Sequence, residues 1–379
     1  MKIVIAGDTV PTRSNWKFFS NGDTKALFGD EIVKIFHSAD FRVLNLEAPL
    51  INEGIEKKKC GPHLYAPTST VKGIKELKVD LVTLANNHIM DYDEQGLRST
   101  CEVLKSHNIK SVGAGENLSE ASKPYIYRQD GMKIGIYACA EHEFSIADCD
   151  AAGANPYEPL DSMDHIAQLH EECDYLIVLY HGGKEFYRYP SPYLQKICRK
   201  MVEKGADIVI AQHSHCVGAK EEYKDGTILY GQGNFLFDGG DDEYWRNGLI
   251  VEINIDRGCK DVLYYPIVKK GNLVRLAGEC EKEKILEGFY VRSADVVGEL
   301  NVKQKYDEFA ENNYNMYLRM VSGNMGTNIF LKILYKVTKG NIMKLLYSEK
   351  SALRMINFIE CEAHRELLLT GLKRSINKK

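Results

Sequence analysis

The chain has 379 residues, of which 44% are hydrophobic and 27% charged, a composition typical of a soluble globular protein. This length allows one large domain with an appendage. The formal net charge of −4 argues against a nucleic-acid partner, because nucleic-acid binding needs a basic surface. No run approaches the roughly 20 apolar residues of a membrane-spanning helix.

The beginning of the chain and its cysteines predict a cytoplasmic location. The first apolar run, Ile3–Ala6, is typical of a strand and lacks the small-residue cleavage site of a secretory signal. The ten cysteines are scattered without CxxC pairs, which favours reduced thiols over a disulfide framework.

Short β-branched apolar runs alternate with longer segments of helical period as far as Tyr230. The expected strands are Ile3–Ala6, Arg42–Leu46, Leu81–Leu84, Ile134–Ala138, Tyr175–Leu179, Ile208–Ala211 and Ile228–Tyr230. The expected helices are Asp30–Ser38, Thr68–Leu77, Gln95–His107, Met163–Glu172 and Pro192–Lys204. This alternation predicts an α/β core with a largely parallel sheet, whose ligand site lies beyond the carboxyl ends of the strands.

The pattern changes after Phe237. Leu249–Ile255 and Val262–Val268 predict a pair of antiparallel strands. From about Ala294 the pattern is helical, and the expected helices are Gln304–Val321, Ile329–Val337, Ile342–Leu346 and Ser351–Leu372. We therefore expect a main domain over residues 1–275 and a basic C-terminal helical region over residues 290–379.

The C-terminal region differs in charge from the rest of the chain. Residues 312–379 carry 12 Lys or Arg and 4 Asp or Glu, whereas residues 1–311 carry 37 and 49. Over residues 328–379, basic and apolar residues alternate at helical spacing. This suits helices packed on the acidic main domain or on each other, but also peripheral contact with a membrane, a polyanion or an acidic partner. A dimer contact is a further interpretation, and the oligomeric state stays open.

Polar side chains that can bind metal ions lie at or just after the ends of five of the expected strands. The clusters are Gly7-Asp8, Asn45-Leu46-Glu47, Asn86-Asn87-His88 with Asp91, His181-Gly182-Gly183 with Glu185, and Gln212-His213-Ser214-His215. Any single member is explained as well by a helix cap or a loop hydrogen bond. Together they bring carboxylate, amide and imidazole ligands, which suit divalent Mn, Fe or Zn. The expected ligands are Asp8, Glu47, Asn87, His181, His213 and His215.

Four further residues have two interpretations each. His88 can donate a proton to a leaving oxygen with Asp91 orienting its ring, or the two can form a structural pair that holds the turn. Glu185 can support an imidazole or touch substrate, or it can be a solvated glutamate. Asn234 can contact the site or only turn the strand.

The motifs and their order resemble the CapA family of capsule or poly-γ-glutamate synthesis proteins, which have a calcineurin-like metallophosphoesterase fold. The resemblance covers about residues 2–270 and rests on Gly7-Asp8, Asn45–Leu50, Ala85–Tyr92, Gly113–Gly115, His181–Phe186, Gly205–His215 and Gly233–Phe235. It implies a four-layer α/β/β/α metallophosphoesterase-like sandwich with a C-terminal helical appendage. It also implies a dinuclear metal site between two sheets.

The resemblance assigns ligands to two metal positions. The first would take Asp8, Glu47 and His215, and the second would take Glu47, Asn87, His181 and His213. His88 matches the histidine that donates a proton in the superfamily. Val10 stands where ordinary members have a histidine, and Glu47 replaces an aspartate as the bridging ligand.

These departures predict a weak first position. Replacing His213 is therefore expected to abolish tight metal binding, whereas replacing His215 is expected to cost less.

Three functions fit these features. The chain can be a metal-dependent phosphoesterase, an enzyme that processes an amide-linked or glycan polymer, or a non-catalytic module that binds an anionic polymer. The expected partner is an anionic small molecule or polymer, which would be the substrate of an enzyme or the ligand of a binding module. Specificity is expected in loops such as Asn52–Pro67 and Glu141–Pro159.

Overall fold

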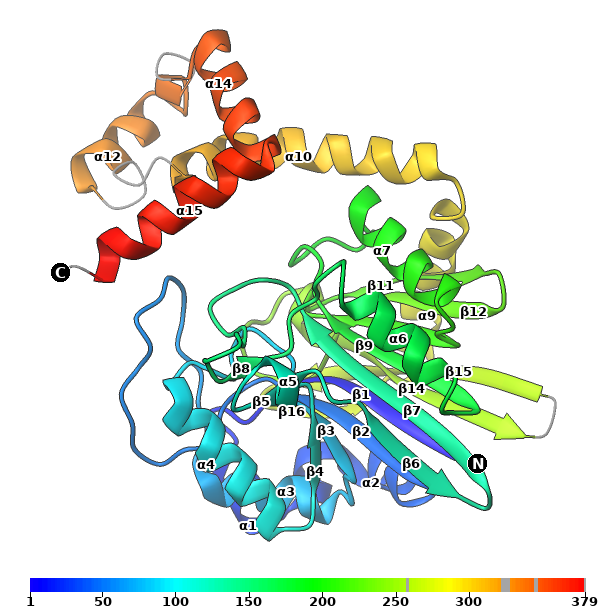
Figure 1. Ribbon diagram of the computed structural model, residues 1–379. Helices are drawn as coiled ribbons and strands as arrows, with labels where there is room; N and C mark the ends of the chain where they lie inside the picture. The colour runs from blue at the N-terminus through cyan, green and yellow to red at the C-terminus, as the bar shows by residue number, and fades with distance from the viewer. Residues whose placement is uncertain (257–258, 322–327, 344–346, 378–379) are drawn as a thin grey trace. The chain divides into compact units, whose positions relative to one another are not determined.

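A computed structural model describes residues 1–256, 259–321, 328–343 and 347–377 (Figure 1). The chain divides into two compact units, Met1–Tyr306 and Asp307–Lys379. The expected helix Ile342–Leu346 runs into residues 344–346, which lie outside the described ranges.

The first unit contains two large sheets. The first sheet has the strand order β16-β15-β14-β1-β2-β3-β4, with β13 paired to β1. Its strands are β1 (Lys2–Val10), β2 (Phe41–Leu46), β3 (Leu81–Thr83), β4 (Lys110–Val112), β13 (Asn234–Phe237), β14 (Asn247–Asp256), β15 (Cys259–Lys270) and β16 (Leu273–Leu276). β1 to β4 are parallel, and β14, β15 and β16 continue the sheet antiparallel.

The second sheet has the order β11-β12-β10-β9-β7-β6. Its strands are β6 (Tyr125–Gln129), β7 (Met132–Ala140), β9 (Tyr175–His181), β10 (Ile208–Gln212), β11 (Val217–Tyr223) and β12 (Gly226–Gln232). The four central strands are parallel, whereas β6 and β11 are joined to them as antiparallel edges. A small third sheet pairs β5 (Ala114–Gly115) with β8 (Gly153–Ala154).

Alternate residues of each central strand contribute to different cores, which defines four layers. Ile5 of β1 and Ile177 of β9 belong to one buried cluster between the sheets. Val4 of β1 packs with Phe28 of α2 in a second cluster on the outer face of the first sheet. The helices of the first unit are α1 (Trp16–Asn21), α2 (Thr24–His37), α3 (Val71–Glu76), α4 (Asp93–Ser106), α5 (Leu118–Ala121), α6 (Ser162–His170), α7 (Pro192–Glu203), α8 (Glu243–Arg246), α9 (Glu279–Asp295) and α10 (Glu299–Val321), which continues into the second unit.

Helices α6 and α7 cover the outer face of the second sheet, where their apolar residues join β9 and β10 in a third cluster. Figure 1 shows the two sheets between these helices and those of the first sheet. The predicted four-layer α/β/β/α sandwich is therefore confirmed, as are the seven predicted strands and the antiparallel pair.

The helix α9 was not predicted in full, because the expected helical pattern begins only near Ala294. Its charged sequence ECEKEKILEGFYVRSAD has few apolar residues, yet Ile285 and Phe289 are buried in the cluster between the sheets. The first unit consequently extends to Tyr306, beyond the expected main domain of residues 1–275. The functional boundary stays a prediction.

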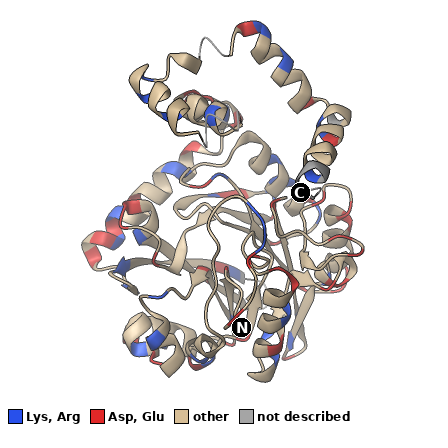
Figure 2. Ribbon diagram, turned by 90° about the vertical axis from the view of Figure 1, so that its left-hand side faces the viewer, with Lys and Arg blue, Asp and Glu red and all other residues tan. Residues whose placement is uncertain are grey.

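The second unit consists of helices: the later part of α10, α12 (Ile329–Val337), α14 (Glu349–Glu360) and α15 (Glu362–Asn377). Its described core is small and centres on Leu318 and Met343. Figure 2 marks the basic residues along these helices. Every described helix of the chain is too short or too polar to span a bilayer.

Candidate metal centre

The carboxylate of Asp8 lies fully buried near the end of β1. It accepts hydrogen bonds from Asn45 Nδ2 (2.8 Å) and from the backbone N–H of His213 (3.1 Å). Just before it, a Cβ at Gly7 would lie 2.2 Å from the carbonyl oxygen of Gly233, so glycine is needed for this close approach. Asp8 thus links its own sheet to the end of β10 in the second sheet through hydrogen bonds.

His213 and His215 follow β10 in an unusual backbone conformation. Their φ angles are +94° and +53°, in the left-handed region that L-residues rarely adopt. Such strain costs about 1–3 kcal/mol per residue and is concentrated at functional sites. This turn brings both imidazoles into the buried centre.

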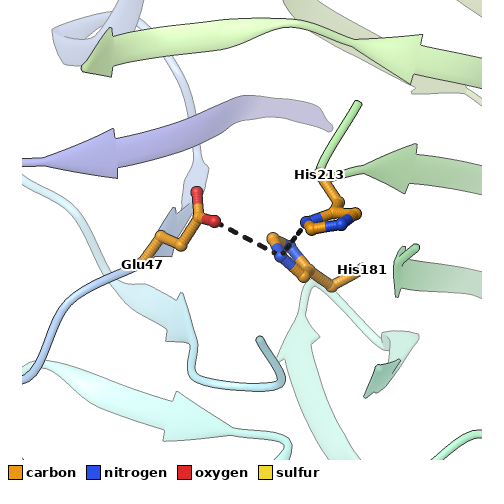
Figure 3. Close-up of side chains that lie close together, drawn as sticks. All are labelled: Glu47, His181 and His213. Atoms are coloured by element: carbon orange, nitrogen blue, oxygen red, sulfur yellow. Dashed lines mark hydrogen bonds and ion pairs between the residues drawn. The ribbon is translucent and has the colours of Figure 1, made fainter. Parts of the chain in front are cut away.

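Three possible ligand atoms surround Nε2 of His181, the last residue of β9. Its Nε2 lies 3.1 Å from Asn87 Oδ1, 3.1 Å from His213 Nδ1 and 3.4 Å from Glu47 Oε1. Figure 3 shows Glu47 facing the two imidazoles from the opposite side. An ion with octahedral bonds of about 2.1 Å holds neighbouring ligand atoms about 3.0 Å apart. We call these four residues the second position.

Glu47 is the clearest sign that the centre is built for a cation. Its side chain is completely buried, and neither carboxylate oxygen accepts a hydrogen bond within the described chain. A buried carboxylate normally has such partners, because its desolvation is otherwise costly. A bound divalent cation would compensate the buried charge of this carboxylate, so the residues present fit a metal centre.

Asp8, Glu47 and His215 form a second cluster of possible ligand atoms, all within 4.8 Å of one another. We call this cluster the first position. His215 Nδ1 lies 3.5 Å from Asp8 Oδ2 and 2.9 Å from Asn234 Oδ1. Asn234 lies directly opposite Asp8 because β13 pairs with β1, so the structure brings it into the site.

The charges of the centre compensate one another. Burial alone would raise the pKa of Asp8, but a hydrogen bond from His215 and the charge of His181 hold it below its usual value. Burial would lower the pKa of His215, yet Asp8 and Glu47 raise it to about 9. Burial and the charge of His181 push the pKa of His213 well below its usual value. Ions binding here would replace these protons.

His88 and Asp91 form the expected pair beside the second position. His88 Nδ1 lies 2.6 Å from Asp91 Oδ2. Asn86 fixes the loop after β3, because its Oδ1 accepts hydrogen bonds from the backbone N–H groups of His88 (3.1 Å) and Ile89 (2.9 Å). His88 is buried and follows Asn87 directly in the chain, so the pair adjoins one of the expected ligands of the second position.

The structure adds residues that were not predicted individually. Lys59, from the loop between β2 and α3, is nearly fully buried and forms an ion pair with Asp91. Glu143, from the loop after β7, accepts a hydrogen bond from Asn87 Nδ2 at 3.3 Å and lies 3.9 Å from His213 Nε2. Both belong to loops expected to determine specificity, but no sequence pattern marked these positions within them.

Two further residues considered in the sequence analysis lie outside the two ligand sets. Glu185 is half-buried and forms no hydrogen bond or ion pair with the described ligands, so its role stays a prediction. Val10, at the position of the usual histidine, is buried in an apolar cluster with Ala48 and Phe237.

The nine cysteines whose side chains are described are free thiols.

The sequence of the chain is similar to those of known proteins. The family model described as "Bacterial capsule synthesis protein PGA_cap" matches residues 2–239. The capsule biosynthesis protein CapA of Bacillus anthracis is 30% identical over 212 residues, which are 54% of this chain and 52% of that protein. The PGA biosynthesis protein CapA of Bacillus subtilis is 30% identical over 210 residues, covering 54% and 55%. The chain thus spans about half the length of these relatives.

Solved structures show a weaker similarity. A phosphatase from Mycoplasma pneumoniae aligns with a TM-score of 0.45 and 14% identity, covering 72% of this chain and 94% of that one. A 5'-nucleotidase from Candida albicans aligns with a TM-score of 0.41 and 13% identity, covering 82% and 58%.

Proposed function

The chain belongs to the PGA_cap family of bacterial capsule synthesis proteins, and from this premise we propose that it is a metal-dependent hydrolase with phosphoesterase-type chemistry. The observation that carries the proposal is Glu47, which belongs to both ligand sets and whose buried oxygens accept no hydrogen bond from the described residues. Two divalent ions (Mn, Fe or Zn), when bound, activate water and stabilise the charge of a phosphoryl group.

The ligand residues have separate tasks in this proposal. Glu47 is shared, Asn87, His181 and His213 complete the second position, and Asp8 and His215 complete the first. Asn45 donates to Asp8 Oδ1 and lies 3.2 Å from His181 Nδ1, so it links the two ligand sets. These buried contacts hold the ligands in place before substrate arrives.

His88 is the proposed general acid. Asp91 holds Nδ1, so Nε2 is the ring nitrogen that remains to give a proton to the leaving oxygen. Lys59 pairs with Asp91 and so keeps this carboxylate from acting as a free negative charge near an anionic substrate. Asp91 and Lys59 therefore orient and balance the ring, whereas His88 performs the transfer.

The substrate is proposed to be anionic and to belong to capsule assembly, because the relatives are named for capsule and PGA biosynthesis. The same names favour a second candidate, chemistry on an amide-linked polymer with the same ligands. A cytoplasmic location stays a prediction.

Hydrolysis assays separate these candidates. Protein loaded with Mn²⁺ is expected to hydrolyse p-nitrophenyl phosphate or bis(p-nitrophenyl) phosphate, and the double variant Asp8→Ala, His213→Ala is expected to be inactive. Activity that survives in the double variant would remove this site from consideration. Hydrolysis of γ-glutamyl-p-nitroanilide alone would favour the amide candidate, and protein that retains no metal would leave only a binding module.

The proton donor has its own test. His88→Asn is expected to lower kcat by about 10²–10⁴-fold while the metal content stays unchanged. His142→Gln, on the exposed part of the loop after β7, is the control and should retain full activity. An unchanged kcat in His88→Asn would leave only the structural role of the His88–Asp91 pair.

A separate proposal concerns the second unit, whose helix α12 suits an anionic lipid surface. Ile329, Phe330 and Val337 are 63%, 78% and 74% exposed and lie on one face of the helix with Ile333 and Leu334. The lysines at 332, 336 and 339 form no ion pair among the described residues. An amphipathic helix of this kind binds at the bilayer interface.

Sedimentation with vesicles tests this contact. The full chain is expected to bind phosphatidylglycerol vesicles and to be released by Lys332→Glu together with Lys336→Glu. Lys350→Glu together with Arg354→Glu, both on α14, is the charge-matched control. Absence of binding to these vesicles would overturn the proposal.

A further inference from the structure

Three aromatic rings surround His215, the ligand on the weaker side of the centre. Trp245 stacks on the imidazole with ring centroids 4.7 Å apart and planes inclined by 19°. Phe237 meets the edge of both rings, at 5.6 Å from His215 and 4.9 Å from Trp245. Phe186 lies 5.9 Å from His215 and 5.6 Å from Trp245. We call these three residues the aromatic clamp.

The clamp continues into a small apolar cluster beside the first position. Val10 and Phe237 belong to the same apolar cluster, and Trp245 packs against it. This side of the His215 ring is therefore lined by hydrocarbon and by the face of an indole. The Nδ1 atom of His215 lies close to Asp8 and Asn234.

Trp245 is itself held firmly. A Cβ at Gly239 or Gly240 would lie 2.6 Å or 2.4 Å from atoms of the indole, so these glycines allow the ring to lie flat against the backbone. Asp242 accepts hydrogen bonds from the N–H groups of Tyr244 (2.9 Å) and Trp245 (3.1 Å), which fixes the start of α8. Buried Lys269 pairs with Asp238 at 2.8 Å and so fastens the segment to β15.

We propose that Trp245 is a positioning residue for the first metal position: it holds the His215 ring in the orientation that binds an ion. This inference rests on the proposed metal centre. A ligand needs to be placed within about 0.5 Å and 10–20° for tight binding. His215 has fewer fellow ligands than His213, because Asn87 adds a fourth residue to the second position, so this restraint matters more for His215.

The electronic character of the indole supports the same role. An imidazole that binds a divalent ion carries partial positive charge, and the face of tryptophan attracts positive charge better than other aromatic faces do. Phenylalanine at position 245 would preserve stacking with a weaker attraction, whereas alanine would remove both.

Intrinsic fluorescence reports directly on this contact, because Trp16 is the only other tryptophan in the chain. In Trp16→Phe protein, Mn²⁺ is expected to quench Trp245 in the phase in which the weaker ion binds. In Trp16→Phe, His215→Ala protein this phase should disappear, while calorimetry still detects the tighter ion. Unchanged Trp245 fluorescence while two ions bind would overturn the proposal. This test leaves Trp245 itself unsubstituted, so it does not depend on whether a variant at position 245 folds.

Substitution of Trp245 gives the second test. Trp245→Ala is expected to weaken the first ion by about 10–100-fold and leave the tighter ion unchanged. Trp245→Phe should recover most of this loss. A merely structural role would lower the thermal stability of Trp245→Ala with both affinities intact, and that result would overturn the inference. If the unsubstituted protein binds no Mn²⁺, the proposed function fails first and this inference with it.

Discussion

The two metal positions differ in how completely the fold supplies their ligands. The second position draws on the ends of β2, β3, β9 and β10, and three ligand atoms lie within 3.4 Å of His181 Nε2. The first position has Asp8, His215 and Glu47, of which Glu47 also belongs to the second position. Val10, which lies on the same strand as Asp8, is an apolar side chain and offers no ligand atom. We therefore expect the second position to hold its ion more tightly than the first.

Glu47→Gln is expected to have the largest effect, because it removes the ligand common to both positions. The amide keeps the shape but cannot offer two anionic oxygens, so tight binding of both ions should be lost. Calorimetric titration of metal-free protein with Mn²⁺ measures this. Retention of either ion at its original affinity would show that Glu47 is not shared.

His213→Ala is expected to abolish tight binding by removing one of four ligands of the second position. We expect the affinity for the tighter ion to fall by at least about 100-fold. Loss of a residue that only supports a ligand costs about 10–100-fold, and loss of the ligand itself should cost more. Circular dichroism provides the folding control. A small change for this ion would mean that the tight site is elsewhere.

His215→Ala is expected to cost less and to affect only the weaker ion. Bound metal, measured by elemental analysis after gel filtration, should fall from two ions to one. The same loss of the tighter ion as in His213→Ala would remove the difference between the positions.

Glu143→Gln is expected to have the smallest effect, about tenfold or less on the second position. The carboxylate accepts from Asn87 Nδ2 and so turns Oδ1 toward His181, and glutamine retains an acceptor. His142→Gln is the matched control from the same loop. An effect of this size on the first position instead would contradict the assignment.

Periodicity was sufficient to predict the central strands, because each is a short apolar run buried on both faces. The edge strand β6 was missed, since its sequence YIYRQ is partly exposed and polar. A signal for it was present in the turn Asp130-Gly131, where both residues have positive φ as in a tight hairpin.

The ligand set could be anticipated because parallel strands place their carboxyl ends at one edge. Lys59, Glu143 and Trp245 could not be anticipated, since each reaches the centre from a loop or a short helix whose path depends on tertiary packing. The stack of Trp245 on His215 joins residues that are 30 positions apart and share no pattern.

Calorimetric titration of the unsubstituted, metal-free protein with Mn²⁺ is the most direct test of the central claim. The predicted result is two binding events of clearly different affinity, of which the weaker disappears in His215→Ala. Binding of no ion, or of two ions with equal affinity, would contradict an unequal dinuclear centre.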